Sequence, residues 1–294
     1  MLHCSDGRPY RETRPPERWA ARVNSKPAAR GARFPAGLQP SAPEATTARK
    51  TTLRPQAPLQ HAAHAAAQQH RPSGLGMDSA AVRAALVQRL RTDLHCHEAV
   101  CDAMRAVPRH HFVDSALVTQ AYADTSLPIG LGQTISKPSV VARMLSLLHE
   151  GGRARASGSL GGVLEIGTGC GYQTALLARM AQRVLSIERL KPLHDKARAN
   201  LGESRAAHIR LVYGDGRLGH PPNAPYDSII AAAGGSDLPA AWLEQLADGG
   251  RLVAPMDGLA GSGQVLLVVD RQGDELRRSI HEAVHFVPLK SGIA

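Results

Sequence analysis

The sequence predicts an α/β fold: a mostly parallel, doubly wound sheet that ends in an antiparallel hairpin. Short apolar runs alternate with helical patterns across the second half of the chain, which is typical of parallel strands joined by helices. The first run, 163–166, ends in a turn with three glycines and leads into a helical pattern at 172–180. Two apolar runs near the end of the chain are separated by 271–274, which favours a hairpin.

The other elements follow in chain order. Residues 80–106 are predicted to be helical, and Pro108 should end that helix because proline cannot continue it. Residues 127–138 contain two glycines and two prolines, so we expect neither a strand nor a helix but a lid over the glycine turn. A short apolar helix is expected at 140–148. Strands are expected at 163–166, 184–187, 208–212, 226–233, 251–256, 264–270 and 276–286.

The glycine turn and one acidic residue predict a nucleotide-like ligand. Glycine accepts positive φ and has no Cβ, so a strand–glycine turn–helix unit brings the backbone close to such a ligand. Glu188 ends the second apolar run, twenty-one residues after Gly167. A carboxylate there can accept hydrogen bonds from both ribose hydroxyls, which favours an adenosine-containing cofactor. The alternative is a turn without a ligand and an exposed charge at a strand end.

The spacing favours S-adenosyl-L-methionine over a nicotinamide cofactor. The dinucleotide pattern is G-x-G-x-x-G, whereas this chain has G-x-G-x-G at 167–171. Glu165, two residues before the first glycine, would repel a pyrophosphate but suits ammonium and sulfonium charges. Asp215, followed by Gly216 after the third strand, could accept a hydrogen bond from an adenine amino group. An ordinary Asp-Gly turn is the other interpretation of that pair.

Charge and composition divide the 294 residues unevenly. Residues 1–76 hold 12 Lys and Arg against 4 Asp and Glu, and 10 of the 20 prolines; residues 77–294 hold 23 against 21. The net charge of +10 therefore comes mainly from the first segment. We predict that 1–76 is a disordered, basic, Pro/Ala-rich extension, because it has too few large apolar residues to offset its ordering entropy. Residues 77–294 should form the folded domain, with a helical and lid segment at 78–150.

Three interpretations of 1–76 remain open. It could be an organelle-targeting segment, it could contact nucleic acid or another anionic surface, or translation could start at Met77. A helical pattern begins directly after Met77, so we favour the third. No apolar run reaches the length of a secretory signal or a membrane span, and we expect a soluble, cytoplasmic protein.

The cysteines do not predict a disulfide framework or a metal site. Four cysteines (Cys4, Cys96, Cys101 and Cys170) lack the regular spacing of a disulfide-stapled domain. The run His95-Cys96-His97 with Cys101 suggests zinc, but no second ligand pair follows at finger spacing. A helix with partly buried thiols is the better interpretation, and no metal is expected.

Several segments resemble the protein-L-isoaspartate O-methyltransferases, S-adenosylmethionine enzymes that repair damaged aspartyl sites. The segments are VPRHHFV (107–113), LPIGLGQTISKP (127–138), VLEIGTGCGYQTALLA (163–178), SIE (186–188), GDG (214–216) and EAVHFVPL (282–289). The resemblance extends over about 80–294. It implies a Rossmann-like class I S-adenosylmethionine-dependent methyltransferase fold that acts on isoaspartyl proteins and peptides. Nucleic acid and membrane are not expected partners, and a monomer is expected.

The resemblance also implies the site residues. Ser136 corresponds to the active-site residue, and Gln133, Thr134 and Ile135 should line the same cleft and contact cofactor or substrate, and we count them among the cofactor-binding residues. Glu188 would bind the ribose, and Asp215 with Gly216 would flank the adenine. The turn on the methionine side of the cofactor would be formed by Glu165, Gly167, Gly169 and Gly171. One departure is visible, because the family usually has an alanine-proline turn where this chain has Ala-Gly-Gly-Ser at 233–236. We expect that loop to be more mobile here.

The implied chemistry needs no general base. A free α-carboxyl group has a pKa near 3.5, so the acceptor is ionised at neutral pH. Ser136 would orient the carboxylate as a hydrogen-bond donor. The rival functions are a methyltransferase with another acceptor, a nicotinamide oxidoreductase and a nucleic-acid-binding module. The near-neutral charge of 77–294 and the few aromatic residues weigh against the last of these.

Overall fold

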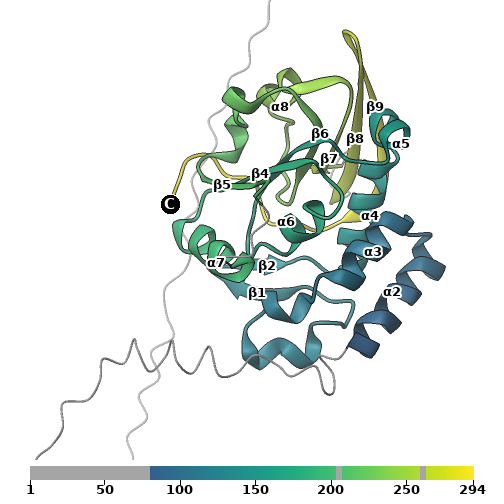
Figure 1. Ribbon diagram of the computed structural model, residues 1–294. Helices are drawn as coiled ribbons and strands as arrows, with labels where there is room; N and C mark the ends of the chain where they lie inside the picture. Colours follow the sequence, from purple (N-terminus) through teal and green to yellow (C-terminus); the bar gives the residue numbers. More distant parts are fainter. Residues whose placement is uncertain (1–79, 203–206, 259–262) are drawn as a thin grey trace, which may run out of the picture. The chain divides into compact units, whose positions relative to one another are not determined.

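A seven-stranded sheet forms the centre of the computed structural model, which describes residues 80–202, 207–258 and 263–294. The strand order is β5-β4-β3-β6-β7-β8-β9 (Figure 1). Parallel pairing joins β5 through β7, and β8 and β9 continue the sheet antiparallel. These strands are β3 Gly162–Ile166, β4 Arg183–Glu188, β5 Ile209–Tyr213, β6 Tyr226–Ala231, β7 Leu246–Asp257, β8 Gln264–Gln272 and β9 Glu275–Val284. The predicted fold class and its antiparallel hairpin are confirmed.

The helices cover both faces of this sheet. They are α2 Ala80–Leu94, α3 Glu98–Ala106, α4 Pro138–His149, α5 Gly152–Ser157, α6 Tyr172–Leu177, α7 Lys191–Leu201 and α8 Ala240–Glu244. Buried side chains of α2, α3, α4 and α6 form one apolar cluster with alternate strand residues such as Val163 and Val184. The opposite face packs Leu164 and Leu185 with Trp242 of α8. Both faces of the parallel strands are therefore buried, which explains their continuous apolar runs.

The prediction of a single helix over 80–106 is wrong, because residues 95–97 interrupt it and separate α2 from α3. His95 has φ 48°, a left-handed conformation that a helix cannot accommodate. His97 then caps α3, since its Nδ1 accepts a hydrogen bond from Ala99 N at 3.3 Å. Such a cap satisfies an otherwise unpaired amide at the helix start. The end of α3 before Pro108 agrees with the prediction.

The prediction that residues 127–138 contain no strand is also wrong. Strands β1 Leu127–Gly130 and β2 Gln133–Ile135 form a small antiparallel hairpin, with Leu127 opposite Ile135. Its tip has three consecutive residues with positive φ: Gly130 at 102°, Leu131 at 54° and Gly132 at 68°. Gly130 and Gly132 would weaken a long strand, but this tight turn requires them because glycine readily adopts positive φ. The hairpin lies beside α7 (Figure 1), where Lys196 Nζ donates to Ile129 O at 3.0 Å.

The remaining predictions concern the N-terminal segment, the cysteines, metal binding and membrane spans. The proposed extension 1–76, Cys4 and the start at Met77 lie outside the described residues. Cys96, Cys101 and Cys170 are buried free thiols. Within the described ranges, no cluster of three or more His, Cys, Asp or Glu side chains is arranged to hold a metal ion. In the same ranges, no helix combines the length and apolar character that a membrane crossing requires.

Candidate active site

A cavity of about 400 Å³ opens at the carboxyl ends of β3, β4 and β6. The strand order reverses beside β3, because the chain continues from it toward β4 on one side and later returns as β6 on the other. Ligands of open α/β sheets bind in the crevice at such a switch point. The walls come from the β1–β2 hairpin, the glycine turn after β3, the residues after β4, and the segment 287–290.

The glycine turn is shaped by positive φ angles. Gly167, Gly169 and Gly171 have φ values of 90°, 57° and 90°. Gly167 and Gly169 line the cavity, as expected from the sequence. Gly171 is not among the lining residues and instead faces α7, where an added Cβ would lie 3.3 Å from Leu201 Cγ. Gly171 therefore serves the turn and the close packing of α7, and contact with a ligand stays a prediction.

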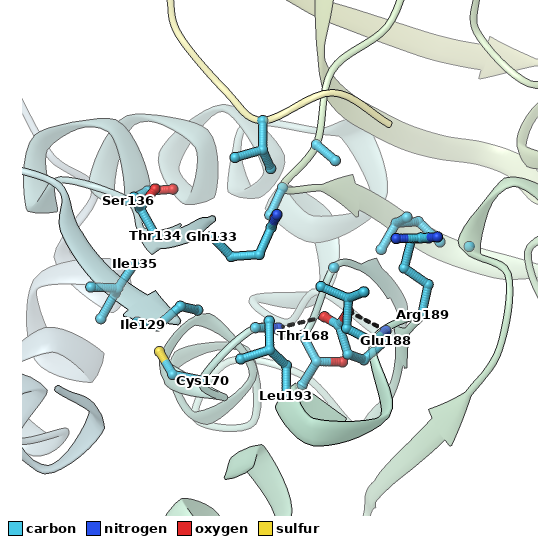
Figure 2. Close-up of a pocket in the computed structure, with 18 of the residues that line it drawn as sticks. Ile129, Gln133, Thr134, Ile135, Ser136, Thr168, Cys170, Glu188, Arg189 and Leu193 are labelled. Atoms are coloured by element: carbon cyan, nitrogen blue, oxygen red, sulfur yellow. Dashed lines mark hydrogen bonds between the residues drawn. The ribbon is translucent and has the colours of Figure 1, made fainter. Parts of the chain in front are cut away.

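Glu188 is fixed by two backbone amides at the edge of the cavity. Its Oε2 accepts a hydrogen bond from Gly169 N, and its Oε1 accepts one from Leu190 N, both at 2.9 Å (Figure 2). Each carboxylate oxygen can accept a further hydrogen bond. The side chain is thus a preoriented acceptor for a pair of neighbouring hydroxyls. Arg189, Leu190 and Leu193 line the cavity next to it. They carry no motif in the sequence, although Arg189 and Leu190 directly follow the predicted ribose acid.

Glu165 lies beneath the turn and does not line the cavity. All five residues of β3 are buried, and Glu165 accepts a hydrogen bond from Thr174 Oγ1 at 2.5 Å. Its Oε1 is buried without a hydrogen-bond partner among the described residues. Burial raises the pKa of Glu165 to about 7. Contact between Glu165 and the cofactor stays a prediction.

We expect Glu165→Gln to remove a pH dependence of stability. The unfolded carboxyl group loses its proton near pH 4.5, whereas burial keeps it protonated in the folded protein up to about pH 7. The folded state then binds more protons, so the free energy of unfolding falls as pH rises through this window. At pH 8 the variant should be more stable than the parent by up to about 3 kcal/mol, and at pH 4.5 by little.

Urea unfolding without cofactor at both pH values measures this difference. Glu244→Gln is the matched control, because Glu244 is exposed and its substitution should leave the pH dependence unchanged. An unchanged difference between the parent and Glu165→Gln from pH 4.5 to pH 8 would show that Glu165 does not carry the titration.

The hairpin supplies the other wall of the cavity. Gln133, Thr134, Ile135 and Ser136 all line it, so the sequence-based grouping of these residues agrees with the geometry. Figure 2 shows the Gln133 side chain extending from the hairpin toward the centre of the pocket, with Ser136 on the side away from Glu188. Among the residues that the structure describes, none hydrogen-bonds the Ser136 hydroxyl. That hydroxyl is available to donate to a ligand.

Asp215 and Gly216 occupy different environments. Gly216 lines the cavity, and an added Cβ there would lie 2.5 Å from Ile166 Cγ2, so only glycine fits. Asp215 does not line the cavity. Its Oδ1 accepts from Arg217 N at 2.9 Å and its Oδ2 from Gly292 N at 2.6 Å. The carboxylate is engaged by the C-terminal segment, and its contact with an adenine stays a prediction.

A family model described as protein-L-isoaspartate(D-aspartate) O-methyltransferase (PCMT) matches residues 81–294. The chain belongs to this family. A protein-L-isoaspartate O-methyltransferase of Methylibium petroleiphilum is 56% identical over 88% of this chain and 96% of its own length. One of Leptothrix cholodnii is 59% identical over 81% of this chain and 84% of its own length.

Solved PCMT structures agree in fold. A protein-L-isoaspartate O-methyltransferase superposes with a TM-score of 0.63 at 24% identity, over 71% of this chain and 66% of the other. A Plasmodium falciparum protein described as a PCMT, solved with S-adenosyl-L-homocysteine, gives 0.60 at 22% identity, over 71% of this chain and 98% of the other. At these identities the likeness shows the fold alone.

In this PCMT family member the segment 287–290 forms part of the cavity wall, a role that the sequence did not reveal. Gly234 N donates to Val287 O at 2.9 Å, and Leu289 N donates to Gly234 O. The 233–236 loop, expected to be more mobile, is thus tied to this segment by backbone hydrogen bonds. A Cβ on Gly234 would lie 2.6 Å from Gln264 Nε2 and 3.1 Å from Pro255 O. Glycine here permits that close approach.

Proposed function

We propose that the chain is a protein-repair enzyme that transfers a methyl group from S-adenosyl-L-methionine to the free α-carboxylate of L-isoaspartyl residues in damaged proteins and peptides. Family membership over 81–294 carries the proposal. The cavity supports it, because a hydroxyl-bearing hairpin, a glycine turn and a preoriented carboxylate line the same cavity. Paired catalytic carboxylates or a Ser-His-Asp arrangement are not needed for this reaction.

The cofactor side of the cavity fits S-adenosyl-L-methionine. Glu188 would accept hydrogen bonds from the two ribose hydroxyls while keeping its bonds to Gly169 N and Leu190 N. The turn at Gly167 and Gly169 has no side chains to block close approach. Glu165, buried beneath the turn, would add negative potential for a cationic ligand when its carboxyl group is ionised. When bound, the cofactor supplies an electrophilic methyl group.

The acceptor side of the cavity orients an anion. The α-carboxyl group of an isoaspartyl residue is ionised at neutral pH, so the protein has no proton to remove. Ser136 would donate a hydrogen bond to one carboxylate oxygen and leave the other directed at the methyl group. The hairpin and segment 287–290 line the cavity around that oxygen. Orientation of two reactants can contribute about 7–11 kcal/mol, which makes positioning the main source of rate acceleration.

We further propose that the enzyme is monomeric and cytoplasmic. Its partners are isoaspartyl proteins and peptides, and it has no nucleic acid or membrane partner. The balanced charge of 77–294, 23 basic against 21 acidic residues, supports the exclusion of nucleic acid. Size-exclusion chromatography with light scattering tests the monomer. A mass of twice 31.2 kDa would contradict it.

Methylation of paired peptides tests the proposed function. Two peptides of identical sequence, one with a normal aspartyl and one with an L-isoaspartyl linkage, are incubated with the protein and methyl-labelled S-adenosyl-L-methionine. We expect base-labile label in the isoaspartyl peptide only. Equal labelling of both peptides would indicate another acceptor. Label in neither, with cofactor binding intact by calorimetry, would overturn the proposed substrate.

A further inference from the structure

Leu131 has a conformation that its side chain does not favour. It lies at the tip of the β1–β2 hairpin with φ 54°, between Gly130 and Gly132. Non-glycine residues rarely adopt this region, and those that do are found disproportionately at functional sites. Gln133 Nε2 donates to Leu131 O at 3.3 Å, which helps to hold the tip. A third glycine would make the same turn without strain, so the turn itself does not require leucine.

The side chain of Leu131 gains little from the fold. It is 57% exposed, which makes it one of the few large apolar residues on the surface of the described chain. The space around the tip is open, because a Cβ added to either neighbouring glycine would meet no atom within 4 Å. A strained backbone and an exposed leucine together cost stability in the free protein. A ligand bound in the cavity that Leu131 lines would supply an apolar contact that offsets this cost.

The position of Leu131 identifies that ligand. Leu131 lines the same cavity as Ser136, five residues further along the hairpin. The segment 287–290 lines the same cavity, and its Pro288 and Lys290 are exposed. A polypeptide that brings its isoaspartyl carboxylate to Ser136 would occupy this cavity, and Leu131 is an exposed part of its lining. The side chains next to the isoaspartyl residue then pass beside Leu131.

We infer that Leu131 is a specificity-determining residue that contacts a side chain directly adjacent to the isoaspartyl residue and favours a large apolar group there. The inference rests on the proposed function and adds a preference among isoaspartyl substrates to it. Apolar contact with a leucine-sized side chain accounts for discrimination of roughly five- to tenfold against a small polar one. The preference should appear at one neighbouring position, because a single side chain provides it.

Five peptides, three of them with an isoaspartyl linkage, test this inference. One reference peptide carries serine on both sides of the isoaspartyl residue, and two peptides carry leucine on one side or the other; two normal aspartyl peptides with leucine serve as blanks. The kcat/KM of each leucine peptide is divided by that of the reference peptide. We expect a ratio of roughly five to ten at one position for the parent protein, and a ratio near one for both Leu131→Gly and Leu131→Asn.

The two variants differ in a useful way. Glycine removes both the side chain and the strain, and asparagine tolerates positive φ while presenting a polar group. Urea unfolding confirms that each variant is folded, with Leu131→Gly expected to be no less stable than the parent. Ile280→Thr is the control, since Ile280 is 64% exposed on β9 and does not line the cavity. Its ratios should equal those of the parent.

The outcomes separate this inference from the proposed function. If the parent and folded Leu131 variants methylate isoaspartyl peptides with the same ratios, the role of Leu131 is overturned and the proposed function stands. A ratio near one at both positions for the parent protein would also overturn the role of Leu131 and leave the proposed function standing. If no isoaspartyl peptide is methylated by the parent, the proposed function and this inference both fail.

Discussion

Ser136→Ala is expected to lower the rate of methyl transfer by about a hundredfold and to change the affinity for S-adenosyl-L-methionine by less than about twofold. The substitution removes one hydrogen-bond donor from the acceptor side of the cavity. Glu188 and the glycine turn, on the other side, keep their hydrogen bonds. Steady-state rates with an isoaspartyl peptide measure the first quantity, and titration calorimetry with the cofactor measures the second.

Ser139→Ala is the matched control for Ser136→Ala. Ser139 lies three residues later in α4 and does not line the cavity, and its backbone N rather than its hydroxyl bonds Asp124 Oδ1. Its rate should equal that of the parent. Loss of cofactor binding together with activity in Ser136→Ala would contradict the orienting role. A rate within threefold of the parent would show that the hydroxyl makes no important contact.

Glu188→Ala should act on the opposite side of the reaction. The substitution removes the acceptor for Gly169 N and Leu190 N and the predicted ribose contact at once. Each hydrogen bond that a ribose hydroxyl would donate to this charged carboxylate contributes about 1.5–3 kcal/mol, and the substitution removes both. We therefore expect the Kd for the cofactor to rise by about a hundredfold or more, measured by calorimetry. Glu188→Gln retains one acceptor oxygen and should give a smaller rise, about tenfold.

Asp195→Asn controls for loss of a negative charge near the same strand end. Asp195 is exposed in α7 and pairs with Lys191, outside the cavity. Its cofactor affinity should match that of the parent. If Glu188→Ala binds the cofactor as tightly as the parent does, the ribose assignment is wrong. If Glu188→Ala is unfolded, Glu188→Gln still decides the question.

Strands buried on both faces could be predicted from the sequence, and short edge elements could not. The parallel strands β3, β4 and β6 are apolar runs because both of their faces are covered. The β1–β2 hairpin has strands of only four and three residues, with proline and glycine among them. Its pairing depends on contacts with the rest of the protein. The helix break at His95 carries no glycine or proline signal, so it was also missed.

The candidate site shows the same division. The glycine turn and Glu188 follow from their positions at strand ends. Whether a residue on a strand buried on both faces points into a cavity cannot be deduced from an apolar run, so the placement of Glu165 beneath the turn needed the structure. Segment 287–290 reaches the cavity through hydrogen bonds with Gly234, more than fifty residues earlier in the chain. Such long-range pairing leaves no local signal.

The central claim is that this cavity orients a carboxylate that is already ionised, without removing a proton. Single-turnover methylation of an isoaspartyl peptide at saturating cofactor, measured from pH 6 to pH 9, tests it most directly. We expect the rate constant to vary by less than about threefold across this range, because the acceptor is fully ionised throughout. A tenfold increase per pH unit over any part of the range would show that a proton must leave before the methyl group moves, and would contradict the claim.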